Sequence, residues 1–244
     1  MNALSIKIDT ELDGTKGAIF PTVLEAENEL LLIDCGFPGM FDRIEAALNK
    51  IALSFARLTG IVITHFDIDH IGSLSVIKTK NPHLVVYASE IEARFISGAD
   101  QPFRLKQALS WLDTVPPQQK SRINHFIGLL TNLEPVEVNF ILKHNQGLPG
   151  LRGFNIVETP GHTPGHISIY LPDSKTLIAG DALVLENSHL ALANPSSAFD
   201  LGMAINSVRS FLELDINKII CYHGGEVAGP IREKLNQLLD KLGN

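Results

Sequence analysis

The sequence lacks several features that mark particular classes of protein. It has two cysteines in 244 residues, so no disulfide framework is available to stabilise a small secreted scaffold. No apolar run approaches the length of a membrane-spanning helix. The formal net charge is −7 and no basic tract is present, which argues against a nucleic-acid partner.

The first fourteen residues also lack the pattern of an export signal. They carry Lys7, Asp9, Glu11 and Asp13 and no apolar core, whereas a signal peptide needs a run of apolar residues. With only two thiols in the chain, we expect a cytoplasmic protein that keeps its cysteines reduced and has no membrane partner.

The composition favours a folded chain with a large core. Apolar residues make up 45% and charged residues 19% of the sequence, and the mean hydropathy is +0.13. These values are typical of globular proteins rather than disordered ones. The length fits one large domain or two small ones. Because no linker or internal repeat is visible, we predict a single domain over residues 1–244.

A polar cluster at residues 64–70 is the strongest local signal. His65, Asp67, Asp69 and His70 follow the apolar run at 60–63, which predicts a buried strand. Ligands commonly bind at strand ends in open α/β folds. A solvated turn that caps a helix is the alternative, and it holds only if no distant partners exist.

Three further segments supply such partners. They are the Thr-Pro-Gly-His-Thr-Pro-Gly-His stretch at 159–166, the Ala-Gly-Asp triplet ending at Asp181, and the Cys-Tyr-His-Gly-Gly stretch around His223. Each one follows or ends a short apolar segment, so each is expected at a strand end. Histidine and aspartate in combination suit divalent first-row metals.

Taken together, these motifs resemble the metallo-β-lactamase superfamily, whose pattern is HxHxDH followed by a histidine, an aspartate and a final histidine. The resemblance extends from the Leu-Ile-Asp-Cys-Gly segment at 32–36 to His223. It implies an α/β fold, the αββα sandwich of that superfamily, with a helical insertion at about 89–132 over the active site.

The apolar periodicity agrees with alternating strands and helices. We expect strands over 18–25, 29–34, 61–64, 84–88, 137–142, 154–159, 167–171, 176–179 and 218–221, and helices over 37–55, 71–79, 201–212 and 227–242. The insertion has helical patterning and no convincing strand. Its apolar residues form either a substrate pocket or ordinary helix packing: Phe103, Leu105, Leu109, Trp111, Leu112, Phe126 and Ile127.

The resemblance also implies a ligand set for two divalent ions. His65, Asp67 and His162 would hold one ion, Asp69, His70 and His223 would hold the other, and Asp181 would bridge them. The expected nucleophile is a hydroxide that bridges the metals, with Asp69 orienting it. By the same resemblance, His166 would support the ligand loop by hydrogen bonding, and Asp34 would have a structural role behind the site.

Asp67 departs from the family pattern, which has histidine at this position. With two divalent ions, three aspartates and a hydroxide, the formal charge of the centre is zero, whereas histidine at 67 would make it +1. An additional oxygen ligand favours harder metals. We expect zinc as the metal. Manganese and iron are alternatives because Asp67 supplies this additional oxygen ligand. The flavodiiron branch similarly has a carboxylate here, but this chain shows no flavodoxin domain.

The resemblance predicts a dinuclear metal-dependent hydrolase acting on a small ester, lactone or thioester. Phosphodiester or organophosphate hydrolysis, a redox di-iron protein and a non-catalytic binding module are alternatives.

Only 21 residues follow His223, too few for the glutathione-binding region of glyoxalase II. Lactonases of this size usually have a tyrosine where Val184 stands. The absent export signal argues against a secreted β-lactamase. The oligomeric state is left open, with a homodimer among the options.

Overall fold

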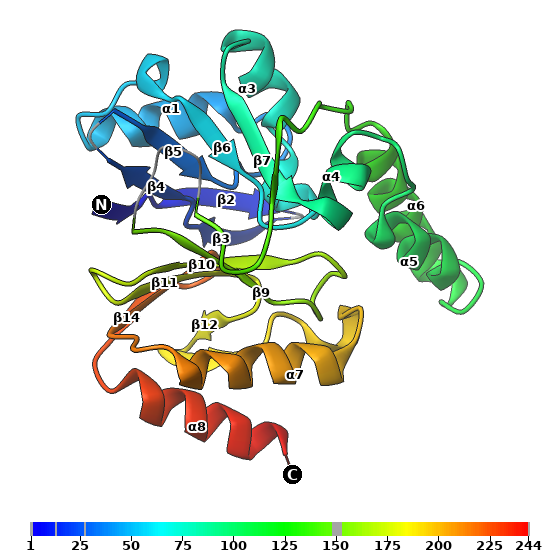
Figure 1. The fold of residues 1–244 in the computed structure, drawn as a ribbon. Coiled ribbons are helices and arrows are strands. Elements are labelled where there is room, and N and C mark those ends of the chain that lie inside the picture. The colour runs from blue at the N-terminus through cyan, green and yellow to red at the C-terminus, as the bar shows by residue number, and fades with distance from the viewer. Residues whose placement is uncertain (1, 13, 27, 148–152, 244) are drawn as a thin grey trace.

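The computed structural model describes residues 2–12, 14–26, 28–147 and 153–243. Two sheets pack face to face, with helices on the outer side of each (Figure 1). α1 (Phe41–Lys50) and α3 (Leu74–Lys80) cover the first sheet, whereas α7 (Leu201–Ser210) and α8 (Ile231–Leu242) cover the second. This arrangement confirms the αββα sandwich that the motifs predicted.

The first sheet is built from the N-terminal half of the chain. Its order is β1 (Asn2–Ser5), β4 (Thr22–Glu25), β5 (Leu30–Ile33), β6 (Gly60–Val62), β7 (Val85–Ser89) and β8 (Phe140–Leu142). The four strands from β5 to β8 are parallel. Since the carboxyl ends of parallel strands meet at one edge of a sheet, the segments after β5, β6 and β7 lie together.

The second sheet is built from the C-terminal half. Its order is β15 (Gly225–Ala228), β14 (Lys218–Cys221), β11 (Thr176–Gly180), β10 (Ile167–Leu171) and β9 (Asn155–Glu158). β11 and β14 are parallel neighbours, so the residues that follow them are also brought to one edge. Two hairpins, β2 (Ile8–Leu12) with β3 (Thr15–Ile19) and β12 (Val184–Glu186) with β13 (His189–Ala191), complete the strands of the described chain.

The remaining helices lie near one edge of the sandwich. They are α2 (Ile68–Ile71), α4 (Glu90–Ile96), α5 (Phe103–Trp111) and α6 (Pro117–Thr131). The last two form an antiparallel pair that projects to one side of the molecule (Figure 1). The helical character expected for 89–132 is therefore confirmed, and its apolar side chains pack mainly on one another, including Leu105, Trp111, Phe126 and Ile127.

The space between the sheets is filled by branched aliphatic side chains. Ile33 and Val62 of the first sheet pack in one cluster with Ile169, Ile178 and Ile220 of the second. All five are at most 3% exposed, and burying each contributes about 1.5–3 kcal/mol. The two sheets therefore share one core. That residues 1–244 form a single domain stays a prediction.

Several expected boundaries were wrong for identifiable reasons. The helix expected over 227–242 begins only at Ile231, because residues 227 and 228 belong to β15, which pairs with β14. The strand expected over 18–25 breaks around Pro21. The helix expected over 71–79 breaks after α2. There Gly72 packs so closely on Pro38 that a Cβ would lie 2.3 Å from its ring.

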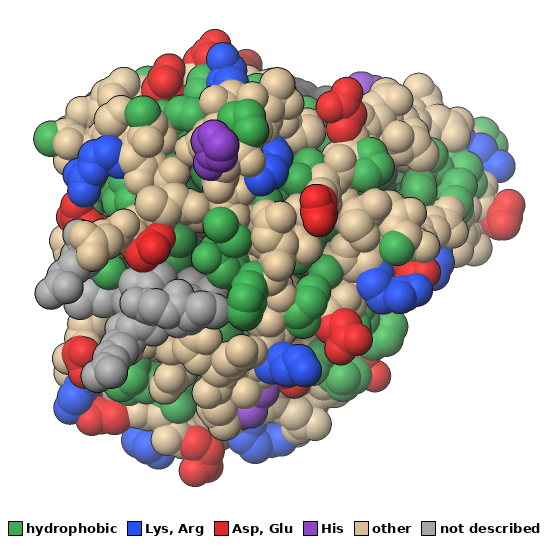
Figure 2. Space-filling view, turned by 45° about the horizontal axis from the view of Figure 1, so that its top comes forward, with side chains coloured by type: hydrophobic (Ala, Val, Ile, Leu, Met, Phe, Trp, Pro, Cys, Tyr) green, Lys and Arg blue, Asp and Glu red, His purple; other side chains and the backbone are tan. Residues whose placement is uncertain are grey.

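No helix among the described residues is long and apolar enough to span a bilayer. On the face shown in Figure 2, the acidic and basic side chains of the described residues are interspersed, without a continuous basic patch.

The loop between β9 and β10 is fixed against α7. The Asp200 amide donates to the Gly161 carbonyl at 3.0 Å, and the Ser207 hydroxyl donates to the Pro160 carbonyl at 2.7 Å. Gly161 has a φ of 137°, and a Cβ there would lie 2.2 Å from the Ala204 nitrogen. Only glycine allows both this backbone conformation and this approach.

We expect Gly161→Ala to lower the free energy of unfolding by about 3 kcal/mol, because the loop must separate from α7. Gly128→Ala is the control, since its Cβ would meet nothing within 4 Å and alanine favours the helix by up to about 1 kcal/mol. Denaturant unfolding compares the three proteins. Equal stability of Gly161→Ala and the parent would show that the close approach is absent.

Candidate metal centre

Four loops at one edge of the sandwich carry the residues that the motifs singled out. The segment 64–70 follows β6, His162 lies between β9 and β10, Asp181 follows β11, and His223 follows β14. The structure brings their side chains into three overlapping groups, each with ligand atoms within 4.8 Å of one another. All seven predicted ligand residues belong to these groups.

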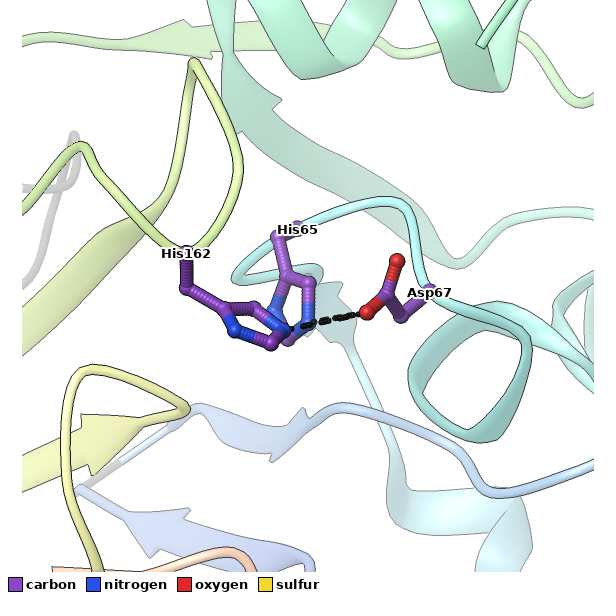
Figure 3. A group of neighbouring side chains, drawn as sticks. All are labelled: His65, Asp67 and His162. Atoms are coloured by element: carbon purple, nitrogen blue, oxygen red, sulfur yellow. Dashed lines mark hydrogen bonds and ion pairs between the residues drawn. The ribbon is translucent and has the colours of Figure 1, made fainter. Parts of the chain in front are cut away.

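The first group consists of His65, Asp67 and His162. Figure 3 shows the Asp67 carboxylate pointing toward both imidazole rings. Its Oδ2 lies 3.0 Å from His162 Nε2 and 3.6 Å from His65 Nε2. We call this group the Asp67 triad. Its three ligand atoms face one small volume, as the resemblance implied for the first ion.

The second group consists of Asp69, His70 and His223, which we call the Asp69 triad. Asp69 Oδ2 lies 3.0 Å from His223 Nε2 and 3.8 Å from His70 Nε2. Asp181 lies between the two triads: its Oδ1 is 3.4 Å from His70 Nε2, and its Oδ2 is 3.6 Å from His162 Nε2 and 3.7 Å from His223 Nε2. This position is the one that a bridging carboxylate requires.

Asp34 fixes one histidine of each triad. Its Oδ2 accepts hydrogen bonds from His70 Nδ1 at 2.8 Å and from the Thr64 hydroxyl at 2.7 Å. Because the Thr64 hydroxyl donates to Asp34, it accepts from His65 Nδ1, 3.0 Å away. Both histidines are thereby held with the proton on Nδ1 and a free lone pair on Nε2.

The structure gives an independent test of whether these residues suit a metal. Four buried polar atoms of the centre lack a hydrogen-bond partner: His65 Nε2, His70 Nε2, His162 Nδ1 and Asp181 Oδ1. Unpartnered buried polar atoms are costly. The two Nε2 lone pairs and the Asp181 oxygen face the volume between the triads, so divalent ions there would satisfy them. Both buried cysteines lie outside the three groups.

His166 has no atom left for a metal. Its Nε2 accepts from the Asp181 amide at 2.9 Å, and its Nδ1 lies 2.8 Å from the Thr159 hydroxyl. Burial lowers its pKa well below the usual range, with the neighbouring His65 and His162 acting in the same direction. His166 therefore stays neutral and orients Asp181, in agreement with its predicted supporting role.

Glu92, from α4, connects the two loops of the Asp67 triad. It is completely buried. Its Oε2 accepts from the Phe66 amide at 2.8 Å, and its Oε1 accepts from the Thr163 hydroxyl at 2.7 Å and the Gly165 amide at 2.9 Å. Burial raises the pKa of Glu92 to about 7, although the three donors act in the opposite direction. Sequence patterning gave no signal for this residue.

Tyr222 performs a similar task for the Asp69 triad. Its hydroxyl donates to the Asp69 carbonyl and accepts from the Gly36 amide. Its ring lies 3.9 Å from the His70 ring, centroid to centroid. The residue next to His223 therefore orients the other two members of the triad.

Arg104, from α5, is a second residue at the centre that sequence reasoning missed. Its guanidinium is 5% exposed and donates from Nε to Asp67 Oδ1 at 2.8 Å and from Nη2 to Asp67 Oδ2 at 2.6 Å. Against the effect of burial, Arg104 and the neighbouring histidines hold the pKa of Asp67 well below its usual value. The formal charge of zero expected for the centre was summed without this arginine. When Arg104 is included, the formal charge becomes +1.

The comparisons with known proteins agree with this geometry. The family model described as the metallo-beta-lactamase superfamily matches residues 14–223. The chain belongs to the metallo-beta-lactamase superfamily.

The chain is also similar to individual proteins and solved structures. It is 27% identical to the probable metallo-hydrolase YflN of Bacillus subtilis, over 89% of this chain and 84% of the relative. It is 25% identical to a hydroxyacylglutathione hydrolase of Synechococcus, over 57% of this chain and 40% of the relative. The crystal structure of the metallo-beta-lactamase family protein TTHA1429 from Thermus thermophilus superposes with a TM-score of 0.74 at 19% identity, covering 99% of this chain and 79% of that one.

We expect His162→Ala to reduce bound metal more than His166→Ala does. The first change removes a ligand atom, whereas the second removes a support for Asp181 and should weaken binding by about 10–100-fold. Metal content after dialysis against a fixed zinc concentration measures both. The reverse order would mean that His166 is the ligand.

Glu92 should give the folding stability a pH dependence that Glu92→Gln lacks. With a folded pKa of about 7 and an ordinary value of 4.5, the favourable contribution of Glu92 is complete below pH 4.5 and is lost as the pH rises to about 7. Between pH 4.5 and 8, the unfolding free energy of the parent should therefore fall relative to the variant by up to about 3 kcal/mol.

Chemical denaturation at several pH values, with equal metal loading, measures this difference. Glu90→Gln on the exposed side of the same helix is the control and should show no such change. A difference between parent and Glu92→Gln that is constant with pH would show that Glu92 is ionised throughout.

Proposed function

We propose that this protein is a metal-dependent hydrolase that uses two divalent ions on a small ester, lactone or thioester. One observation carries the proposal. Histidine lone pairs and aspartate oxygens from four separate loops converge on one volume, and several of these buried atoms have no partner within the described protein. Such an arrangement is costly unless cations complete it.

Each residue has a defined part in this proposal. His65, Asp67 and His162 would hold one ion, Asp69, His70 and His223 the other, and Asp181 both. Bound divalent ions lower the pKa of water and polarise the scissile group of a substrate. The chain itself holds the histidine tautomers through Asp34 and Thr64. The Asp69 carboxylate would orient the attacking water.

The centre is open on the side of the Asp69 triad. The side chains of His223 and Asp69 are 35% and 18% exposed, whereas those of His162 and Asp67 in the other triad are 7% and 13% exposed. Substrate and water would therefore approach beside Asp69 and His223. This geometry supports the role of Asp69 in orienting water, since it can contact solvent and the centre together.

The relatives and the residues near the centre support the proposed substrate class. Relatives include hydroxyacylglutathione hydrolases, which supports an ester or thioester. Val184, where similar lactonases have a tyrosine, is buried and apolar. The Tyr222 hydroxyl is already bonded to the Asp69 carbonyl. Neither residue supplies a free hydroxyl to the substrate, so polarisation of the carbonyl would depend on the metals.

In this proposal the helical insertion would accommodate the rest of a substrate. A cavity of about 650 Å³ lies between Glu11 of β2 and the α5–α6 pair, where Trp111 and Phe126 contribute apolar surface. Phe103 instead packs edge-to-face on Phe199. We include in the proposal a small-molecule substrate, a cytoplasmic location and reduced Cys35 and Cys221, which are both free thiols in the structure.

We expect Asp181→Ala to lower kcat/KM on the best substrate of an ester, lactone, thioester and phosphodiester panel by at least about a thousandfold. Metal content should fall as well, because the carboxylate faces both triads. The test is a panel assay with metal analysis of protein purified without added metal. Asp215→Ala, at an exposed aspartate paired with Lys175, is the control and should retain both properties.

Two results would contradict the proposal. One is hydrolysis that survives complete removal of metal by a chelator. The other is bound iron with a redox-sensitive optical spectrum and no hydrolysis of any substrate class, which would identify a redox protein instead.

A further inference from the structure

Among the described residues, the Asp67 triad is in direct contact with a buried cationic side chain and the Asp69 triad is not. Arg104 Nη2 lies 2.6 Å from Asp67 Oδ2 and 3.3 Å from His162 Nε2. These are two of the three atoms that would bind an ion there. In the described part of the chain, Asp69, His70 and His223 receive no hydrogen bond or ion pair from lysine or arginine.

The guanidinium is held firmly in this position. Its Nη1 donates to Gln107 Oε1 at 2.6 Å and to the Ser197 carbonyl at 2.7 Å. Gln107 donates to the same carbonyl at 3.0 Å. With the two bonds to Asp67 and the contact of Nη2 with His162 Nε2, all five N–H groups of the guanidinium have a protein partner. Arg104 therefore cannot leave without breaking several charge-assisted hydrogen bonds. It therefore acts as a resident cation and has no free donor for a substrate.

A metal ion at the Asp67 triad would have to share its ligands with this cation. Asp67 Oδ2 already accepts from Arg104, which reduces the electron density that it can give to a metal. Two positive charges around the same oxygen also repel each other strongly in a buried site. The charge of Arg104 also acts on Asp69, but more weakly than on Asp67, its direct hydrogen-bond partner. Tyr222 and Asp34 hold two members of the Asp69 triad in place.

We propose that Arg104 makes the two metal sites unequal: a first divalent ion binds tightly at the Asp69 triad, and a second binds at the Asp67 triad at least about tenfold more weakly. The inference depends on the proposed metal centre but not on the substrate. Arg104 would give α5 of the helical insertion a direct part in metal binding. All the ligands expected from the sequence lie outside this insertion.

The test is calorimetric titration of metal-free protein with zinc chloride alone, with a competing chelator for the tight step. The parent should bind in two steps whose dissociation constants differ by at least about tenfold. Arg104→Gln should tighten the second step by about tenfold or more and leave the first within about twofold. Arg94→Gln, which removes an exposed arginine paired with Asp100, should change neither step.

A milder variant covers the case in which Arg104→Gln does not fold without metal. Gln107→Leu removes one anchor of the guanidinium and keeps the arginine, so it should tighten the second step by a smaller factor. His162→Ala should abolish the second step and retain the first, which assigns the weak step to the Asp67 triad.

Three outcomes overturn the inference. Equal affinities in the parent would show that Arg104 does not distinguish the sites. A weaker second step in Arg104→Gln or Gln107→Leu would mean that the arginine positions Asp67 for metal binding and does not oppose it. Loss of the tight step in His162→Ala would place the tight site at the Asp67 triad. Failure to bind any zinc would instead contradict the proposed function itself.

Discussion

The hydrogen bonds of Asp34 are the constraint on which the centre depends. One oxygen of this buried carboxylate accepts from His70 Nδ1 and from the Thr64 hydroxyl, which in turn accepts from His65 Nδ1. A single group therefore sets the tautomer of a histidine in each triad. The carboxylate reaches this position because Asp34 follows β5 with a φ of 62°. That uncommon conformation for a residue other than glycine fits a functional site.

Parallel strands make this arrangement possible. β5, β6 and β7 end at the same edge, which places Asp34, the loop after Val62 and the start of α4 side by side. β11 and β14 do the same for Asp181 and His223 in the other sheet. The extensive apolar contact between the sheets then holds the two half-sites at a fixed distance. The geometry of the site therefore depends on the packing of the core, because a shift between the sheets would separate Asp181 from Asp69 and His70.

The part of this centre that the sequence predicted consists of short, contiguous motifs. His65, Asp67, Asp69 and His70 lie within six residues, and each distant candidate ligand comes within four residues after the end of an apolar strand. Strand ends and polar clusters are local properties and can be read from one sequence.

Arg104 and Glu92 are different. Arg104 contacts a residue 37 positions away, Glu92 contacts residues up to 73 positions away, and both lie on helices whose local pattern resembles any amphipathic segment. Only the tertiary structure reveals them. β15 was missed for the same reason, since its pairing with β14 overrides a weak local preference.

The pair of Asp67 with Arg104 changes how the aspartate at this position should be understood. Considered alone, Asp67 replaces a neutral ligand with a negative one and makes the centre less positive. Considered with Arg104, the added negative charge is matched by a buried positive charge 2.6 Å away, and the formal sum returns to that of a centre with histidine. Asp67→His alone would therefore not recreate the common family site. It would leave a guanidinium that is 5% exposed without its carboxylate, and breaking a buried pair in this way is strongly destabilising. Only the double change Asp67→His with Arg104→Gln would restore a neutral ligand without an unmatched charge, so metal preference at this position belongs to the pair of residues.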